Sequence, residues 1–216
     1  SSSCTVYRQV KKMPIEESTP FQPPTSPYGH TKQVGEQIIK YTCKGYPNFS
    51  AISLRYFNPI GAHPSSKIGE NPKGVPQNLV PFLTQTVIGN YPVLKVFGSN
   101  YNTTDGTCIR DYIHIMDLAQ AHIDSLAYLI SSEKGIYETF NVGTGHGVSV
   151  LELIKTFEKV TGKHVPFEYG KPRYGDTAAS YADVSKIEGS IGWKAKYDIG
   201  QALLSAWEWE KKRNLK

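Results

Sequence analysis

Short apolar runs alternate along this chain with segments in which apolar residues recur every three or four positions. Helical spacing covers residues 28–41, 78–88, 116–130, 148–160 and 199–213. Strand-like runs cover residues 51–57, 93–97, 111–115, 138–142 and 165–169. Pro-rich segments at 13–27 and 58–76 predict loops. Because helices and strands alternate, the pattern predicts an α/β fold.

The first predicted helix carries the clearest candidate for chemistry. Tyr28 and Lys32 lie one helical turn apart and therefore share a face. A free phenol loses its proton only near pH ~10, and a nearby ammonium favours the phenolate, so such a pair can move a hydroxyl proton beside a redox cofactor. The spacing also arises by chance in a chain with 14 tyrosines. Two other pairs have it but lack a helical context: Tyr7 with Lys11, and Tyr91 with Lys95.

A glycine-rich segment follows the predicted strand at 138–142 and precedes a helix. Gly143, Gly145 and Gly147 are spaced as GxGxG rather than the GxGxxG of dinucleotide-binding turns. Glu168 is a weak candidate for the downstream acidic residue. The spacing therefore favours a tight strand-to-helix turn over a cofactor loop.

Other polar residues have two interpretations each. The serines at 1–3 can donate a hydrogen bond to a developing carbonyl or can cap a turn. Arg55, Arg110 and Arg173 can each fork onto phosphate oxygens or form an ordinary surface ion pair.

Composition narrows the class of protein. The net charge of +5 is spread without a basic stripe, which argues against nucleic acid and fits anionic small molecules. Cys4, Cys43 and Cys108 are too few and too far apart for a disulfide framework, as is usual in a reducing compartment. No CxxC or HExxH pattern suggests a metal site, and no apolar run reaches the ~18 residues of a membrane span. We expect a soluble, cytoplasmic protein.

Six ordered motifs give the chain a family resemblance. They are SSSCTVY at 1–7, SPYGHTK at 26–32, LRYFNPIGAHP at 54–64, PQNLVP at 76–81, DGTCIRDYIH at 105–114 and RYGD at 173–176. Together they closely resemble UDP-glucose 4-epimerases, which are NAD-dependent enzymes of the extended short-chain dehydrogenase type. The resemblance implies interconversion of UDP-glucose and UDP-galactose by reversible oxidation at sugar C4. Members of this family are often homodimers.

The resemblance also implies roles for individual residues. Ser3, Tyr28 and Lys32 match the catalytic positions, with Tyr28 as the base. The cofactor positions are matched by Ser3, Tyr28, Lys32, Tyr56 and Pro59. Contacts to the UDP-sugar are implied for Asn58, Asn78, Leu79, Lys95, Phe97, Arg110, Arg173, Asp176 and Ser180. On this resemblance, the glycine-rich segment is not the NAD-binding turn.

Some features depart from the family. Arg8 stands where the family usually has Gly, and Cys4 where it often has Ala. Ser180 is small at a position that is bulky or small in the family, which leaves room for an N-acetyl group and predicts activity on UDP-N-acetylhexosamines.

The family carries an N-terminal Rossmann half of roughly 120 residues that is not found here. We therefore expect a C-terminal part: residues 1–58 as a remnant of the Rossmann domain, and 59–216 mainly as a smaller mixed α/β UDP-sugar-binding domain, with segments around 105–145 returning to the Rossmann part. We expect this fragment alone to be inactive.

Two alternatives stay open. One is another NAD-dependent nucleotide-sugar epimerase or dehydratase. A dehydratase needs a carboxyl acid–base group beside the tyrosine, and Ser3, Cys4 and Thr5 offer none. The other alternative is a UDP-sugar-binding module without catalysis.

Overall fold

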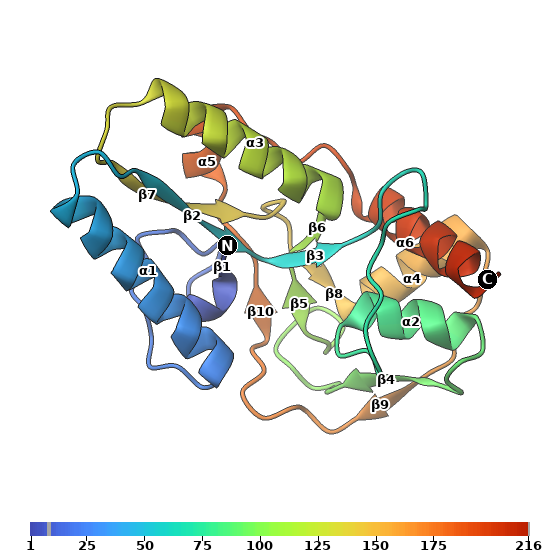
Figure 1. Cartoon of the computed structure of the whole chain (residues 1–216). Coiled ribbons are helices and arrows are strands. Elements are labelled where there is room, and N and C mark those ends of the chain that lie inside the picture. The colour runs from blue at the N-terminus through green and yellow to red at the C-terminus, as the bar shows by residue number, and fades with distance from the viewer. Residues whose placement is uncertain (8–9, 216) are drawn as a thin grey trace.

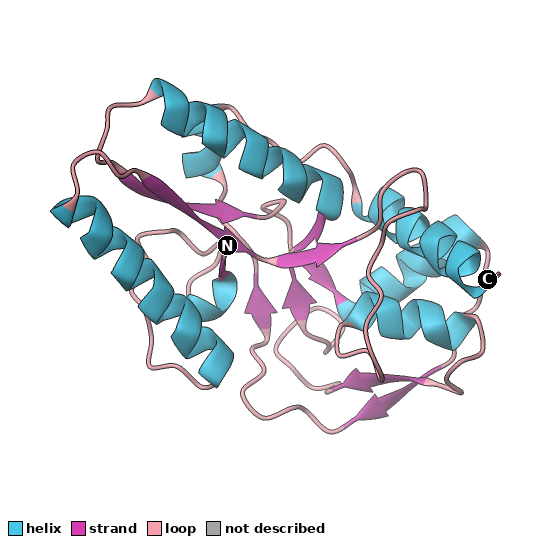
Figure 2. Cartoon of the chain, viewed as in Figure 1, coloured by secondary structure: helices cyan, strands magenta, loops and turns pink. Residues whose placement is uncertain are grey.

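The computed structural model describes residues 1–7 and 10–215 of the 216-residue chain, so the departure at Arg8 lies outside the described residues. Strands and helices alternate, and most strand pairs are parallel (Figure 2). The predicted α/β fold is confirmed. No helix among the described residues is long and apolar enough to cross a membrane.

A three-stranded parallel sheet forms one side of the molecule. Its strands, in spatial order, are β1 (Ser2–Ser3), β2 (Ala51–Tyr56) and β7 (Tyr137–Val142). Helix α1 (Pro27–Gly45) covers one face, and α3 (Ile115–Ser131) with α5 (Ser185–Ile191) covers the other (Figure 1). Leu54, Phe140 and Trp193 belong to the buried apolar core between the sheet and the second pair of helices.

Three helices and a two-stranded sheet form the other side. They are α2 (Leu79–Val87), α4 (Val150–Thr161) and α6 (Ile199–Asn214), with β4 (Leu94–Phe97) parallel to β9 (Phe167–Gly170). Leu83, Phe157, Leu203 and Trp207 lie at the centre of their shared core. This core buries the apolar face that the sequence predicts for each helix.

Short strands lie between these two sides. The pairs are β3 (Asn58–Ile60) with β6 (Tyr112–His114), and β5 (Ile109–Arg110) with both β8 (Val148–Ser149) and β10 (Ala179–Ser180). A single turn of 3-10 helix, η1 (Cys4–Val6), follows β1. These two- and three-residue elements bring four distant segments together between the two sides of the molecule, namely residues 1–6, 58–60, 109–114 and 179–180.

The sequence prediction differs from the structure in several elements. Helix α1 extends beyond the predicted range 28–41 at both ends. It begins at Pro27 because Ser26 caps it and proline suits the first helical position. The interval 58–76 is not all loop, since it begins with β3. The run at 111–115 ends one residue early, where His114 becomes the cap of α3. Elements β1, η1, β5, β8, β10 and α5 were not predicted.

The glycine-rich segment is a tight turn, as its spacing favours. The buried Asp111 carboxylate accepts hydrogen bonds from the backbone N–H groups of Thr144, Gly145 and Ala182. A Cβ on Gly143 would lie 2.4 Å from the Asp111 Oδ2 atom. Two N–H groups that would face a phosphate in a cofactor loop are therefore already bound to this side chain.

A buried polar network fixes α1 against the sheet. The Arg55 guanidinium donates to both carboxylate oxygens of Glu36, at 2.8 and 2.6 Å, and to the Tyr7 hydroxyl at 2.7 Å. Ser2 also donates to Glu36, and Tyr7 donates to Asn141 Oδ1 at 2.6 Å. The phosphate-binding interpretation of Arg55 is therefore wrong: burial and a buried partner give this side chain a structural role.

Candidate functional site

A cavity of about 330 Å³ opens between the two sides of the molecule. Its wall comes from the end of β1 and η1, from β3, from the start of α2, from β4 and β5, and from the segment after β9. Segments far apart in the sequence thus converge on one space that is large enough for a small-molecule ligand.

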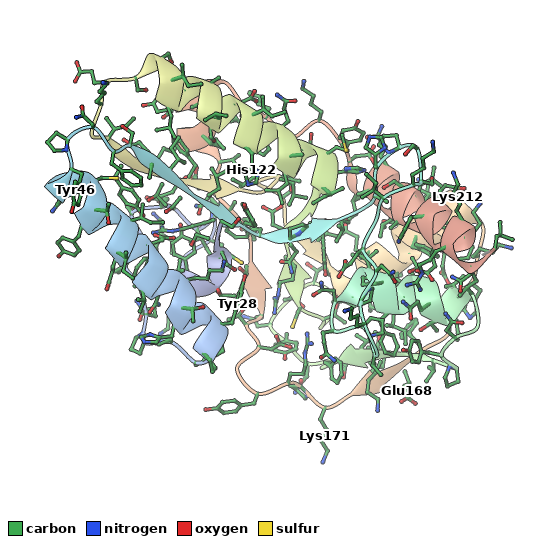
Figure 3. All side chains as sticks on the ribbon, viewed as in Figure 1. Tyr28, Tyr46, His122, Glu168, Lys171 and Lys212 are labelled. Atoms are coloured by element: carbon green, nitrogen blue, oxygen red, sulfur yellow. The ribbon has the colours of Figure 1, made fainter. Side chains whose placement is uncertain are left out.

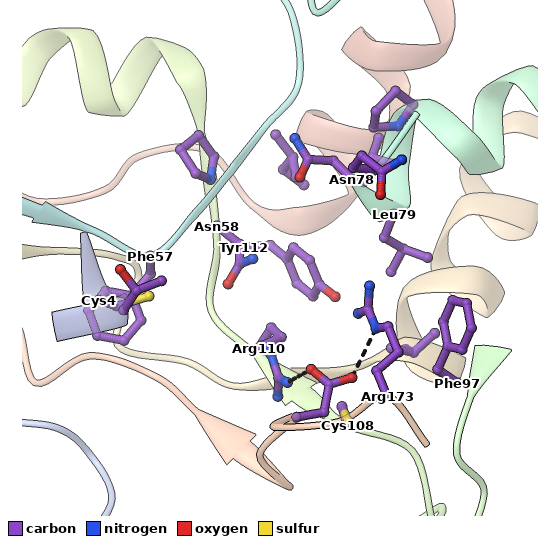
Figure 4. Close-up of a pocket in the computed structure, with 18 of the residues that line it drawn as sticks. Cys4, Phe57, Asn58, Asn78, Leu79, Phe97, Cys108, Arg110, Tyr112 and Arg173 are labelled. Carbon is purple, nitrogen blue, oxygen red and sulfur yellow. Dashed lines mark hydrogen bonds and ion pairs between the residues drawn. The ribbon is translucent and has the colours of Figure 1, made fainter. Parts of the chain in front are cut away.

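One end of the cavity carries positive charge. The Asp176 carboxylate lies between two guanidinium groups: Arg110 Nη2 is 3.3 Å from Oδ1, and Arg173 Nε is 3.1 Å from Oδ2 (Figure 4). Arg110 also donates to the carbonyls of Ile109 and Thr177, both at 2.8 Å. These bonds hold the two cations side by side, an arrangement that can bind a diphosphate.

An aromatic ring lies next to this cationic end. Phe97 is partly exposed at the end of β4, and the Arg173 guanidinium carbon is 4.8 Å from its ring centroid. Lys95, two positions earlier, is 3.5 Å from the carboxylate of Glu168. A flat ring beside cations can stack a nucleobase whose phosphates the cations hold.

The Tyr28/Lys32 pair lies at the start of α1. Figure 3 shows Tyr28 on this helix. Tyr28 is 55% exposed, and Lys32 Nζ lies 5.5 Å from the centroid of its ring. Lys32 also donates to the carbonyl of Ser1 at 3.0 Å. The first turn of α1 packs on η1, since a Cβ on Gly29 would lie 3.6 Å from the carbonyl oxygen of Thr5.

Ser3 ends β1 beside that turn. Its hydroxyl accepts a hydrogen bond from the Thr5 N–H at 3.2 Å, so it caps η1 and also lines the cavity. Cys4 lines the same wall, and burial raises the pKa of its thiol to about 11. The thiol is therefore neutral at physiological pH and adds no charge next to Ser3.

Tyr56 ends β2, where it pairs with Ser3 of β1. Its hydroxyl lies 2.6 Å from His122 Nε2 and 2.9 Å from the Ser1 hydroxyl. His122 Nδ1 is 2.8 Å from the carbonyl of Leu118, which can only accept, so Nδ1 carries the proton and Nε2 accepts from Tyr56. Burial raises the pKa of Tyr56, which keeps its phenol protonated.

Most of the predicted site residues meet at the cavity, although their binding roles stay predictions. The cavity is lined by Ser3, Asn58, Pro59, Asn78, Leu79, Lys95, Phe97, Arg110, Arg173 and Asp176. Tyr28, Lys32, Tyr56 and Ser180 are not part of its lining. Ser180 lies next to it on β10, where it pairs with Arg110.

Tyr112 and Glu70 are among the cavity-lining residues that sequence reasoning missed. The Tyr112 side chain lines the cavity next to Arg110, and burial raises its pKa, so its phenol can donate to an anion. Tyr112 lies in the motif at 105–114, and that motif was the available signal. Glu70 also lines the cavity but lies in the Pro-rich segment, where no periodicity indicates which side chains face inward. No group of three metal-ligating side chains occurs among residues 1–7 and 10–215.

Comparison with known proteins gives a consistent picture. A family model described as GDP-mannose 4,6 dehydratase matches residues 1–205. The UDP-glucose 4-epimerase of Dictyostelium discoideum is 46% identical over 210 residues, which are 97% of this chain and 60% of that protein. The chain thus spans about 60% of the length of the curated relatives that it matches.

Solved structures agree with the sequence comparison. The UDP-glucose 4-epimerase of Bifidobacterium longum, in complex with NAD+ and UDP, superposes with a TM-score of 0.93 at 43% identity, covering 99% of this chain and 63% of that one. The enzyme of Stenotrophomonas maltophila, with bound NAD and formylated UDP-arabinopyranose, gives a TM-score of 0.96 at 42% identity, with coverage of 99% and 63%.

Proposed function

The chain belongs to the family described by the GDP-mannose 4,6 dehydratase model, and from this premise we propose that it forms the substrate side of an NAD-dependent UDP-sugar 4-epimerase. The proposed reaction interconverts UDP-glucose and UDP-galactose. Part of this proposal is the division into a Rossmann remnant at 1–58 and a mainly UDP-sugar-binding region at 59–216, with 105–145 returning to the Rossmann part.

One observation carries the proposal: the cavity joins a diphosphate-binding end to the surroundings of the Tyr28/Lys32 pair. Arg110 and Arg173 supply the guanidinium groups for two phosphates, and Phe97 supplies the ring for uracil. Ser3 is part of the same wall at the opposite end, beside the first turn of α1. A ligand held by its diphosphate would extend its sugar toward Ser3.

The residues present fit one end of NAD. Tyr28, Lys32 and Tyr56 lie at the carboxyl end of a parallel sheet, where dinucleotides bind, and they offer two phenols and an ammonium to a ribose and a nicotinamide. The glycine-rich turn does not fit the pyrophosphate, because Asp111 occupies its N–H groups. When bound, NAD would take up a hydride from sugar C4 and return it.

The chain's own residues would handle the proton. Tyr28 would take the proton of the sugar 4-hydroxyl, and the Lys32 ammonium lies on the same helix face. The Ser3 hydroxyl would donate to the forming carbonyl oxygen. Arg110 and Arg173 would keep the diphosphate bound while the 4-keto sugar turns to present its other face.

Dehydration is disfavoured by the carboxylates of the site. Among the described residues lining the cavity, Glu70 and Asp176 are the carboxylates, and both are hydrogen-bonded to side chains. Glu36, near Ser2, is fully engaged by Arg55. A 4,6-dehydratase needs a free carboxyl group next to the tyrosine. Epimerisation needs none.

The proposal extends to substrate breadth, to the chain taken alone, to assembly and to location. The small side chain of Ser180, next to the cavity, supports acceptance of UDP-N-acetylhexosamines. For the 216 residues taken alone, the proposal expects UDP binding without turnover, because no pyrophosphate-binding turn occurs among the described residues. Homodimerisation and a cytoplasmic location are also parts of the proposal, carried by the family resemblance.

Calorimetry on the 216-residue chain tests the proposal. We expect UDP to bind, and Arg173→Gln to weaken binding about tenfold, as loss of a charge-assisted pair does. Lys171→Gln is the matched control, since Lys171 is not part of the cavity lining and projects outward from the molecule (Figure 3). Absence of UDP binding to the unmodified chain, or equal affinities for both variants, would contradict the proposal. Turnover of UDP-galactose by this chain would contradict its expected inactivity.

A further inference from the structure

Helix α2 begins at the cavity without a side-chain cap. Its N-cap residue is Asn78, whose backbone angles of −86° and 147° suit capping, but its side chain makes no capping hydrogen bond. Pro81 occupies the third helical position and has no N–H. The N–H groups of Leu79 and Val80 have no recorded acceptor among the described residues, and both residues line the cavity.

The Asn78 side chain is held elsewhere. Its Nδ2 atom donates to Glu70 Oε1 at 2.7 Å (Figure 4 shows Asn78 and Leu79 on the wall of the cavity). Asn is among the best capping residues, so an Asn that has capping backbone angles but does not cap indicates a competing partner. Glu70 is that partner.

Glu70 is itself held in place by contacts of its segment with α6. Trp209 of α6 donates from its indole Nε1 to the Glu70 carbonyl at 2.9 Å. Gly69 lies flat against the same ring, since a Cβ there would come 2.4 Å from the indole. Lys212, also on α6, donates to the Ser65 carbonyl at 3.2 Å. The segment that carries Glu70 is therefore fastened to α6, and its carboxylate has a defined position.

We propose that Glu70 is a positioning residue, whose carboxylate holds the Asn78 amide away from the start of α2 and leaves the Leu79 and Val80 N–H groups open to an anionic ligand. The inference rests on the proposed function, since UDP is the ligand that supplies the anion. Free N–H groups at a helix start bind phosphate oxygens well. An Asn78 side chain turned onto Val80 would compete with the ligand for the same donor.

Two variants of equal charge isolate this role. Glu70→Gln keeps an oxygen that can accept from Asn78, whereas Glu70→Ala keeps none, and both remove the negative charge from the cavity. We expect the Ala variant to bind UDP about fivefold more weakly than the Gln variant, as competition from an internal Asn cap implies. Glu208→Gln, which removes an exposed charge on α6, should leave UDP affinity unchanged. Equal affinities of Glu70→Ala and Glu70→Gln would overturn the proposal.

A measurement without ligand separates this proposal from the proposed function. In Glu70→Ala, Asn78 is free to cap α2, so its Oδ1 atom should accept from the Val80 N–H and slow the hydrogen exchange of that amide relative to the unmodified chain. In Glu70→Gln, which keeps an acceptor for the Asn78 amide, the Val80 amide should exchange as it does in the unmodified chain. Equal exchange rates in Glu70→Ala and Glu70→Gln would overturn the role of Glu70, whether or not UDP binds. If the unmodified chain does not bind UDP, the proposed function fails while this exchange measurement still decides the role of Glu70.

Discussion

Ser180 is the residue at which substrate breadth is expected to be set. It lies on β10, beside Arg110 on β5, and its carbonyl accepts from the Asp111 N–H at 3.1 Å, so its backbone position is fixed. Its small side chain leaves space next to the cavity. A tyrosine there would fill that space without changing the strand pairing.

We expect Ser180→Tyr to weaken binding of UDP-N-acetylglucosamine about tenfold relative to UDP-glucose, which is the usual order of a steric penalty. Calorimetry with both nucleotide sugars measures the ratio of the two affinities. Ser190→Tyr, on the exposed surface of α5, is the matched control. An unchanged ratio in Ser180→Tyr would remove Ser180 from the specificity argument.

The sequence identifies which residues can bind phosphate by their chemistry, but it does not show which partners surround each of them. Arg55, Arg110 and Arg173 were equivalent candidates for phosphate. The structure separates them, because Arg55 meets Glu36 in the interior while the other two flank Asp176 at the cavity. The partners of Arg55 and Arg110 lie 19 and 66 positions away in the chain, so no local pattern could indicate them, whereas Asp176 follows Arg173 in the same short motif.

Helix α3 is the element whose stability depends on a titrating cap. His114 Nδ1 accepts from the Met116 N–H at 3.0 Å, so Nδ1 must be unprotonated and Nε2 donates to the Ser205 hydroxyl at 3.1 Å. The ring also stacks on Tyr197, with centroids 4.2 Å apart. Burial lowers the pKa of His114 below its ordinary value of 6.5, against an opposing effect of Asp117.

Because the pKa of His114 is lower in the folded chain than in the unfolded chain, the unfolded chain binds a proton at this ring at a higher pH. The contribution of His114 to stability is therefore complete above pH 6.5 and declines as the pH falls below 6.5, by at most about 1.4 kcal/mol per pH unit. We expect His114→Asn, which keeps a capping acceptor but does not titrate, to lose this part of the pH dependence. Urea unfolding between about pH 7 and pH 5.5 measures it. If the free energy of unfolding changed with pH equally in both proteins, His114 would not be the titrating group.

At the element scale, the long helices and β2 followed from periodicity, while the short strands did not. Strands β3, β5, β8 and β10 have two or three residues each, too few to show a period. They form only because distant segments pair there. Two of these strands, β3 and β5, form part of the cavity wall, so a part of the fold that shapes the site was among the least predictable.

Helices α1 and α3 each carry a stripe of apolar side chains that is exposed to solvent. On α1, Val34, Ile38 and Tyr41 are exposed, and Ile38 is 60% accessible. The exposed residues on α3 include Leu126 and Ile130, the latter 78% accessible. The helices flank the β1-β2-β7 sheet on opposite faces (Figure 1). Stripes of this kind at helical spacing usually meet another surface.

We expect the 216-residue chain to self-associate through these stripes. Ile38→Lys combined with Ile130→Lys should lower the concentration-dependent increase in sedimentation coefficient, because each lysine makes burial of its stripe costly. Leu204→Lys, which changes an exposed leucine on α6, should not. Both stripes lie outside the cavity, so the double variant should bind UDP as the unmodified chain does. If the double variant associates as strongly as the unmodified chain, the contact lies on another surface, and the two stripes are merely exposed.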